Sequence, residues 1–209
     1  DLFRDRLIFP IITTQGHVIG FGGRILGEGQ PKYLNSPETP VFTKGKNLYG
    51  LHATAKYIRA EDTAFVVEGY MDAIALYRQG FRNVVATLGT ALTPNHAKLI
   101  KKLASNVIVL FDGDDAGIAA SDKSLPLFLE AGLSAKCLIL PDGLDPDDFF
   151  NERGVEAFRA LVTSAPDHFL SFLTRQFKDY KGQPSDKVQV LDAVKESLAR
   201  TADPRLKEL

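Results

Sequence analysis

The sequence predicts an α/β fold, with a parallel sheet flanked by helices, a β-rich segment before it and a helical subdomain after it. Between residues 63 and 140, short apolar runs alternate with helical stretches, which is typical of a doubly wound parallel sheet. The first sixty residues are rich in turns, and the residues after 140 have helical patterns throughout. We therefore expect three parts, residues 1–60, 61–150 and 151–209.

The first part begins with a predicted β-hairpin. Two apolar runs, residues 7–12 and 17–21, flank a polar turn at residues 13–16, and such a pair of runs indicates antiparallel strands. Residues 30–46 follow, with three prolines and many polar groups. This stretch is too irregular for a helix and too rich in specific polar groups for a simple spacer.

The middle and last parts contain predicted strands and helices in the following order. The strands are residues 64–67, 84–86, 106–111 and 135–140, and the helices between them are residues 70–79, 94–103 and 116–131. Thr93 and Pro94 are suited to the N-cap and first helical position, and Gly80 is suited to helix termination. Helices are expected at residues 146–153, 155–163, 166–180 and 185–201, the last with Ser185 as its N-cap.

Composition excludes several classes of protein. Hydrophobic residues make up 44% and charged residues 24% of the chain, which excludes a disordered, collagen-like or coiled-coil chain. The longest apolar runs are of strand length, far short of the ~20 residues of a membrane span, so no membrane partner is expected. The single cysteine, Cys137, rules out an internal disulfide and a cysteine-rich zinc site. We expect no zinc and a cytoplasmic location, and we expect a fragment because the chain begins at Asp1.

Charge is unevenly distributed along the chain. Residues 1–60 carry eight Lys and Arg against four Asp and Glu, whereas residues 61–150 carry seven against thirteen. This distribution is suited to a protein that holds phosphates with one part and divalent cations with the next. On charge alone, ordinary surface variation is the favoured explanation.

Acidic residues follow three of the four predicted strands. Glu68 comes directly after the first strand, and Asp112 and Asp114 come directly after the third. Because the carboxyl ends of parallel strands meet at one edge of the sheet, these carboxylates are expected to converge, and Mg²⁺ relieves such repulsion with oxygen ligands. Asp145 and Asp147 follow the fourth strand, and they fit an N-cap and a first helical turn equally well.

Of two other motif interpretations of residues 112–117, the first fails and the second is disfavoured. A calcium EF-hand loop requires an oxygen ligand at its fifth position and Glu at its twelfth, and this sequence has Ala116 and Lys123 there. A dehalogenase-type phosphatase also has Asp-x-Asp after a strand, but Asp115 stands where its motif usually continues with Thr or Val.

A set of motifs gives the chain a family resemblance. They are residues 67–72 (VEGYMD), 86–93 (ATLGTALT), 111–117 (FDGDDAG) and 140–147 (LPDGLDPD). Upstream of them lie residues 9–11 (FPI), 18–24 (VIGFGGR), 31–39 (PKYLNSPET), 44–46 (KGK) and 48–51 (LYGL). In this order and spacing, the sequence resembles the Toprim-containing core of bacterial replicative primases of the DnaG type.

The resemblance implies a Toprim-like sheet and two sets of site residues. The implied catalytic acids are Glu68, Asp112 and Asp114. The implied ligands of two or more Mg²⁺ or Mn²⁺ ions are these three residues together with Asp145 and Asp147. Asp72 is a further acid near them. The implied contacts to template and nucleotide, a basic ridge, are Arg24, Lys32, Tyr33, Asn35 and Lys44. Glu68 serves either as a metal ligand or as a general base. Without the resemblance, the ridge would more simply be a solvated basic face.

The resemblance also implies a function. It is that of a DNA-directed RNA polymerase that makes short RNA primers for DNA replication by nucleotidyl transfer. Its partners would be a single-stranded DNA template, ribonucleoside triphosphates, the RNA primer and, through a region absent from this sequence, the replicative helicase. Because the zinc-ribbon and helicase-binding domains of full-length primases are not found in this sequence, we expect the isolated fragment to synthesise primers poorly.

Other Toprim proteins are the alternatives. A Toprim nuclease has no need of the basic segment from Arg24 to Lys44, and a non-enzymatic recombination module has no need of a full acidic set. A topoisomerase needs a nucleophilic tyrosine in a separate domain.

Overall fold

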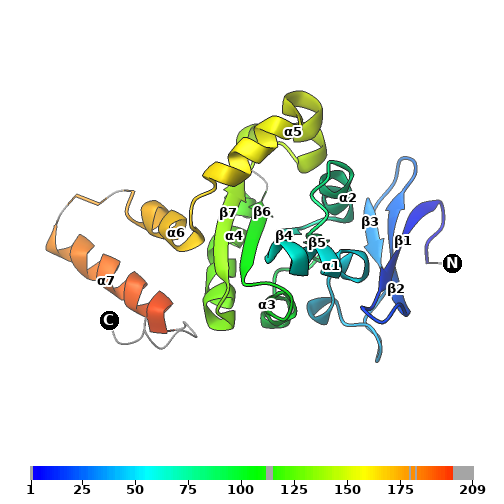
Figure 1. The fold of residues 1–209 in the computed structure, drawn as a ribbon, viewed down its shortest axis with the longest axis horizontal. Coiled ribbons are helices and arrows are strands. Elements are labelled where there is room, and N and C mark those ends of the chain that lie inside the picture. Colours follow the sequence, from blue (N-terminus) through cyan, green and yellow to red (C-terminus); the bar gives the residue numbers. More distant parts are fainter. Residues whose placement is uncertain (1, 112–114, 179, 182, 200–209) are drawn as a thin grey trace.

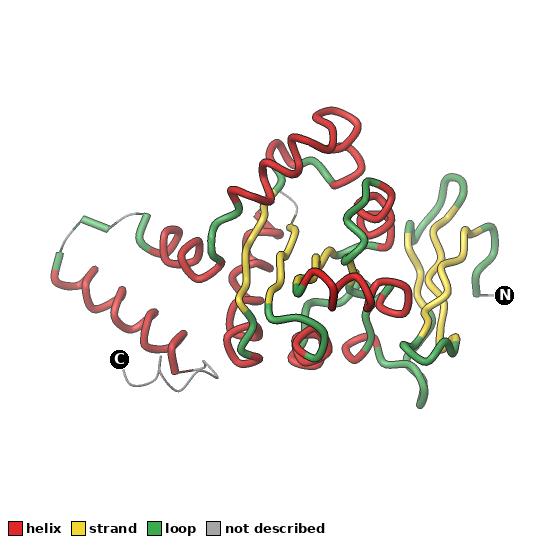
Figure 2. Tube along the Cα trace, in the orientation of Figure 1, coloured by secondary structure: helices red, strands yellow, loops and turns green. Residues whose placement is uncertain are grey.

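Two β-sheets organise the chain in the computed structural model, which describes residues 2–111, 115–178, 180–181 and 183–199. The first sheet is antiparallel, with the order β1 (Arg6–Ile12), β2 (Val18–Ile25), β3 (Tyr33–Asn35). The second is parallel, with the order β5 (Val84–Ala86), β4 (Thr63–Val67), β6 (Asn106–Phe111), β7 (Ser134–Ile139). Figures 1 and 2 show the antiparallel sheet at one end of the molecule and the parallel sheet at its centre. The predicted α/β class is confirmed.

The predicted hairpin is present and is longer than expected. Strands β1 and β2 pair in antiparallel register, with Phe9 opposite Gly22, and the amide of Gly16 closes the turn on the carbonyl of Thr13 at 2.9 Å. Strand β2 continues to Ile25, which pairs with Arg6 of β1, and β3, which lies in the irregular stretch, pairs with β2 on its other side.

Helices cover both faces of the parallel sheet. Helices α1 (Leu51–Glu61), α3 (Pro94–Lys101) and α4 (Asp115–Ala131) share one buried apolar cluster with strand residues such as Val66 and Val109. Helices α2 (Tyr70–Arg78) and α5 (Pro146–Ser164) share a second cluster with the opposite face. The strands are therefore buried on both sides, as the sequence predicts for a doubly wound sheet.

A third, aromatic cluster joins the two sheets. The rings of Phe9 on β1 and Tyr70 on α2 are stacked, with their centroids 5.2 Å apart. Gly22 makes this contact possible, because a Cβ atom there would lie 2.5 Å from the Tyr70 ring. Ile11, Phe42 and Leu88 are the other buried members of the cluster. The start of α2, just after β4, is thus held against the antiparallel sheet.

The C-terminal part is helical, as predicted. Helix α5 is interrupted at Gly154, where φ is 77°, in agreement with the two helices expected there. The short helix η2 (Pro141–Gly143) precedes it, and α6 (His168–Gln176) and α7 (Pro184–Ala199) lie at the far end from the antiparallel sheet (Figure 1). The N-cap expected at Ser185 is wrong: α7 begins at Pro184, and the Asp186 carboxylate instead accepts from the amide of Gln183.

None of the helices in the described ranges is both long and apolar enough to cross a membrane.

Candidate active site

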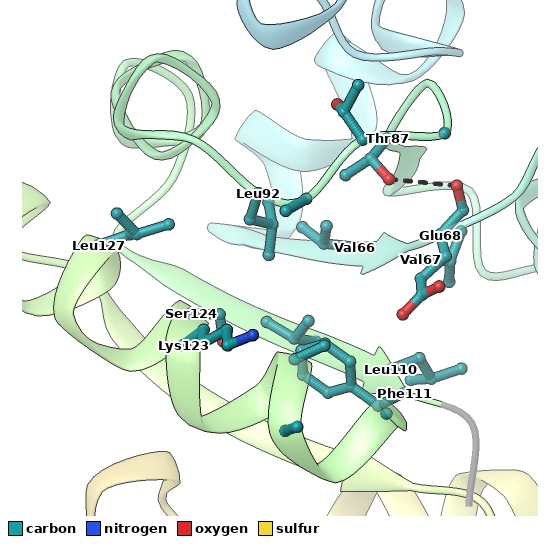
Figure 3. A pocket seen from close by; sticks show the side chains of 17 residues that line it. Val66, Val67, Glu68, Thr87, Leu92, Leu110, Phe111, Lys123, Ser124 and Leu127 are labelled. Atoms are coloured by element: carbon teal, nitrogen blue, oxygen red, sulfur yellow. Dashed lines mark hydrogen bonds between the residues drawn. The ribbon is translucent and has the colours of Figure 1, made fainter. Parts of the chain in front are cut away.

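Glu68 lies at the carboxyl edge of the parallel sheet. It directly follows β4, which pairs with β6 on one side and β5 on the other. The amide of Thr87 donates to the carbonyl of Val67 at 3.0 Å, and the Thr87 hydroxyl donates to the Glu68 carbonyl at 3.2 Å. These bonds fix the main chain, while the Glu68 side chain is exposed and directed into a pocket (Figure 3).

The pocket has a volume of about 660 Å³, which lies within the range of small-molecule sites. The ends of β4 and β6, residues 87–92 and helix α4 line it. Lys123 of α4 lines it as well, and its ammonium group is directed toward the interior (Figure 3). Lys123 was not a candidate from the sequence, because its position at the pocket depends on how α4 lies across the sheet. An acid and a base thus line one pocket, which is suited to a ligand that carries phosphates and a cation.

The other two acids of the predicted catalytic set, Asp112 and Asp114, lie outside the described residues. Strand β6 leads directly to them and ends at Phe111, in register with β7 and beside β4. Within residues 2–111 and the described stretches after 114, no group of three or more His, Cys, Asp or Glu side chains could hold a metal ion. The five-carboxylate metal set therefore stays a prediction.

The remaining acids have local hydrogen bonds at helix starts. Asp72 accepts a hydrogen bond from the amide of Gly69 at 2.9 Å, which secures the start of α2 just after Glu68. Asp145 accepts from the amide of Asp148 at 2.8 Å. The N-cap interpretation of Asp145 is therefore confirmed, while its metal-binding role, like that of exposed Asp147 in the first turn of α5, stays a prediction.

Arg24 and Tyr33 of the predicted ridge lie together on adjacent strands. The Arg24 guanidinium carbon is 5.8 Å from the centre of the Tyr33 ring. Partial burial raises the pKa of Tyr33; Arg24 lowers it, and the carboxylates of Asp72 and Asp145 raise it. The Tyr33 ring centroid also lies 6.4 Å from that of Tyr70, so this part of the antiparallel sheet is next to the start of α2.

Lys44 and Lys32 occupy different positions. Lys44 is half-buried in η1 (Lys44–Lys46), where its carbonyl is 3.0 Å from Nε2 of the fully buried His96. Burial lowers the pKa of His96, so the neutral ring donates this bond. Lys32 is exposed beside Tyr33, which leaves its side chain accessible to a ligand.

Asn35 connects the antiparallel sheet to the carboxyl edge. Its amide nitrogen donates to the carbonyl of Leu88 at 2.8 Å, and its amide oxygen accepts from the Tyr70 hydroxyl. Burial raises the pKa of Tyr70 to about 12, so this hydroxyl keeps its proton at neutral pH. Asn35 thus positions the segment that carries Thr87, and its predicted contact with nucleotide is not tested by these bonds.

We expect Asn35→Ala to lower the free energy of unfolding by about 2 kcal/mol, because the Tyr70 hydroxyl and the Leu88 carbonyl both lose a partner. Urea denaturation measures the change. Tyr70→Phe and the double variant complete a cycle with a coupling energy of about 1 kcal/mol. Additive effects in this cycle would contradict the described bond between Asn35 and Tyr70.

Comparison with known proteins agrees with this architecture. Residues 65–150 match a family described as Toprim-like, and residues 1–55 match the N-terminal domain of the DNA primase catalytic core. The fold and the edge that bears Glu68 therefore define a Toprim-type protein preceded by a primase core domain. The chain belongs to the DnaG family of DNA primases, since it is 38% identical to a DnaG catalytic core, covers 68% of it and superposes with a TM-score of 0.91.

Other relatives are similar over most of this chain. The DNA primase of Clostridium acetobutylicum is 48% identical over 90% of the chain and that of Aquifex aeolicus is 46% identical over 90%. The alignments cover 31% and 40% of those two proteins, so the chain spans about a third of the curated relatives it matches. A DnaG primase catalytic domain bound to single-stranded DNA is 38% identical, with 99% of this chain and 68% of that one covered and a TM-score of 0.90.

Proposed function

We propose that this chain is the Toprim-containing part of a primase catalytic core and takes part in the synthesis of short RNA primers on a single-stranded DNA template. The observation that supports this most strongly is the position of Glu68. A hydrogen bond fixes its main chain, and its exposed carboxylate is directed into a pocket at the carboxyl edge of the sheet. The proposed location is the bacterial cytoplasm, at the replication fork.

In the proposed reaction, the 3′-hydroxyl of one ribonucleotide attacks the α-phosphate of the next, and pyrophosphate leaves. Glu68, with Asp112 and Asp114, would hold Mg²⁺ or Mn²⁺, which stabilises charge on the attacking and leaving oxygens. The exposed carboxylate of Glu68 fits such a hard cation. Lys123 on the opposite side of the pocket is suited to the triphosphate.

The basic ridge has the separate task of holding template and nucleotide. Arg24 is positioned against Tyr33, and Lys32 lies exposed next to that ring. Cations of this kind contact phosphates, and an exposed tyrosine ring offers a surface on which a base stacks. Tyr33 lies beside Tyr70, which begins α2 two residues after Glu68, so one nucleotide would reach from the ridge to the acidic edge.

Exchange of this chain for the matching segment of a related primase tests the proposal. This chain is substituted for the corresponding segment of the Aquifex aeolicus primase, with which it is 46% identical over 200 residues. We expect the chimera to incorporate labelled ribonucleotides in a template-dependent manner. A folded chimera that binds template but makes no primer would count against the proposed function.

We expect Lys32→Ala to weaken binding of single-stranded DNA to the chain. If Lys32 contacts one phosphate, the slope of log K against log salt becomes shallower by about 0.7, and affinity at 0.1 M salt falls about fivefold. Fluorescence anisotropy at several salt concentrations measures both. Lys178→Ala, which removes an exposed lysine from the end of α6, is the control, and equal behaviour of the two variants would place Lys32 outside the binding surface.

A further inference from the structure

A second basic surface lies along helix α3, outside the pocket that contains Glu68. It is a groove of about 490 Å³, and we call it the lysine groove. Its four lysines are Lys46, Lys98, Lys101 and Lys102. All four are exposed, and they come from two separate elements, η1 and the end of α3. Glu130 of α4 is the acidic member of the lining.

Lys44, one residue of the proposed ridge, is held next to the groove. Thr93, the N-cap of α3, donates from its hydroxyl to the carbonyl of Gly45 at 2.6 Å. His96, one turn further, contacts the carbonyl of Lys44 at 3.0 Å. These bonds attach η1 to the start of α3, so Lys44 of the ridge and Lys46 of the groove are fixed beside the helix. Lys44 and Lys46 therefore lie next to α3, which carries the other lysines of the groove.

The spacing along α3 suits a repeating anion. Lys98 and Lys102 are four residues apart, so they lie on the same side of the helix and are separated by a rise of about 6 Å. This separation is comparable to that of successive phosphates in a single strand. The rest of the lining consists of Asn95, Leu99 and Ala131, which provide an amide and an aliphatic floor rather than surfaces on which bases stack.

Helix stability explains only part of this arrangement. Lysines near a helix C-terminus interact favourably with its dipole, and the Lys101 ammonium also donates to the carbonyl of Gly132 at 2.7 Å, just after α4. Neither effect accounts for Lys46, which belongs to another element. Like charges at Lys98 and Lys102 repel each other across one helical turn, so an anionic ligand would stabilise the groove.

We propose that the lysine groove binds the phosphate backbone of single-stranded DNA that continues from the ridge. This inference rests on the proposed function, since it extends the path of the template beyond the pocket. The contact is to the backbone, because lysine side chains recognise phosphates without reading base sequence.

The test compares two single-stranded DNA oligonucleotides with the 209-residue chain. One has about 4 nucleotides and is limited to the ridge, and the other has about 16 and reaches the groove. The variant Lys46→Ala/Lys98→Ala/Lys102→Ala keeps Lys101, which bonds to Gly132. The control removes three exposed lysines elsewhere and has the same net charge: Lys136→Ala/Lys187→Ala/Lys195→Ala.

We expect the groove variant to bind the long oligonucleotide about 100-fold more weakly at 0.1 M salt, with a salt slope shallower by about 2, since each phosphate contact contributes about 0.7. The short oligonucleotide and the control variant should show little change. Glu130→Gln should strengthen binding of the long oligonucleotide several-fold, a gain that misfolding cannot produce.

The outcomes separate this inference from the proposed function. If neither groove variant changes the affinity for the long oligonucleotide while Lys32→Ala still weakens the short one, the groove is overturned and the proposed function stands. If the unmodified chain binds neither oligonucleotide, both are overturned. Should the triple variant fail to fold, Glu130→Gln decides alone: unchanged affinity for the long oligonucleotide overturns the groove.

Discussion

Glu68→Gln is expected to lower the rate of primer synthesis by roughly 10²–10³-fold or more, because it removes a charge that acts on the reacting phosphate or its metal. The fold should survive, since the bond from Thr87 to Glu68 uses the carbonyl of Glu68 and not its side chain. Incorporation of labelled ribonucleotides by the Aquifex aeolicus chimera measures the rate, and thermal unfolding of the chain measures the fold.

The matched control is Glu61→Gln. Glu61 is an exposed glutamate that ends α1, at the opposite end of β4 from Glu68. Its side chain is identical to that of Glu68, and it also lies close to β4 in the sequence, but it is at the amino edge of the sheet. We expect its variant to synthesise primers at the unmodified rate. Equal rates for the two variants would show that the carboxyl edge at Glu68 is not the catalytic centre.

Most of the fold could be predicted from local patterns. After their first residues, Thr63 and Asn106, the strands β4 and β6 consist of buried apolar residues, which appear in the sequence as short uninterrupted apolar runs. The start of α3 was equally clear, because Thr93 accepts a hydrogen bond from the amide of His96 and Pro94 follows it. Such signals are confined to a few neighbouring residues, and for that reason a single sequence contains them.

Strand β3 and helix α1 are among the elements that were not predicted, because one depends on a distant partner and the other has a weak local signal. Strand β3 has only three residues, and it forms through pairing with β2, for example Tyr33 opposite Arg24. Helix α1 buries Leu51, Ala55 and Ile58 on the parallel sheet. Their helical spacing was present in the sequence, but the β-rich character of the preceding fifty residues concealed it.

The site shows the same division between local and distant effects. The position of Glu68 after a buried strand was visible in the sequence. In contrast, the bonds of Asn35 connect it to residues 35 and 53 positions away, so nothing near Asn35 reveals that its amide positions the carboxyl edge. Lys123 is likewise brought to the pocket only by the packing of α4 on the sheet. Sequence patterns identify the chemical groups, and tertiary packing decides which of them meet.

Phe158→Ala is expected to lower the free energy of unfolding by about 3–5 kcal/mol, since truncating a fully buried aromatic ring leaves a cavity. Phe158 lies at the centre of an aromatic cluster that attaches α5 to the parallel sheet. Its ring centroid is 4.8 Å from that of Phe81, 4.9 Å from Phe150, 6.0 Å from Phe149 and 6.3 Å from Phe65. Phe149 follows Asp145 by about one helical turn, so the cluster also anchors the helix start that carries Asp145 and Asp147.

Urea denaturation of the chain measures this loss, and Phe21→Ala is the control. The Phe21 side chain on β2 is 41% exposed, so the same truncation there should cost less than about 1.5 kcal/mol. A second measurement links the cluster to the site: loosening of α5 should move the Asp145 carboxylate away from Tyr33, so the pKa of Tyr33, followed by ultraviolet absorbance, should fall in Phe158→Ala. If Phe158→Ala costs no more than Phe21→Ala, helix α5 is not anchored to the sheet by this cluster.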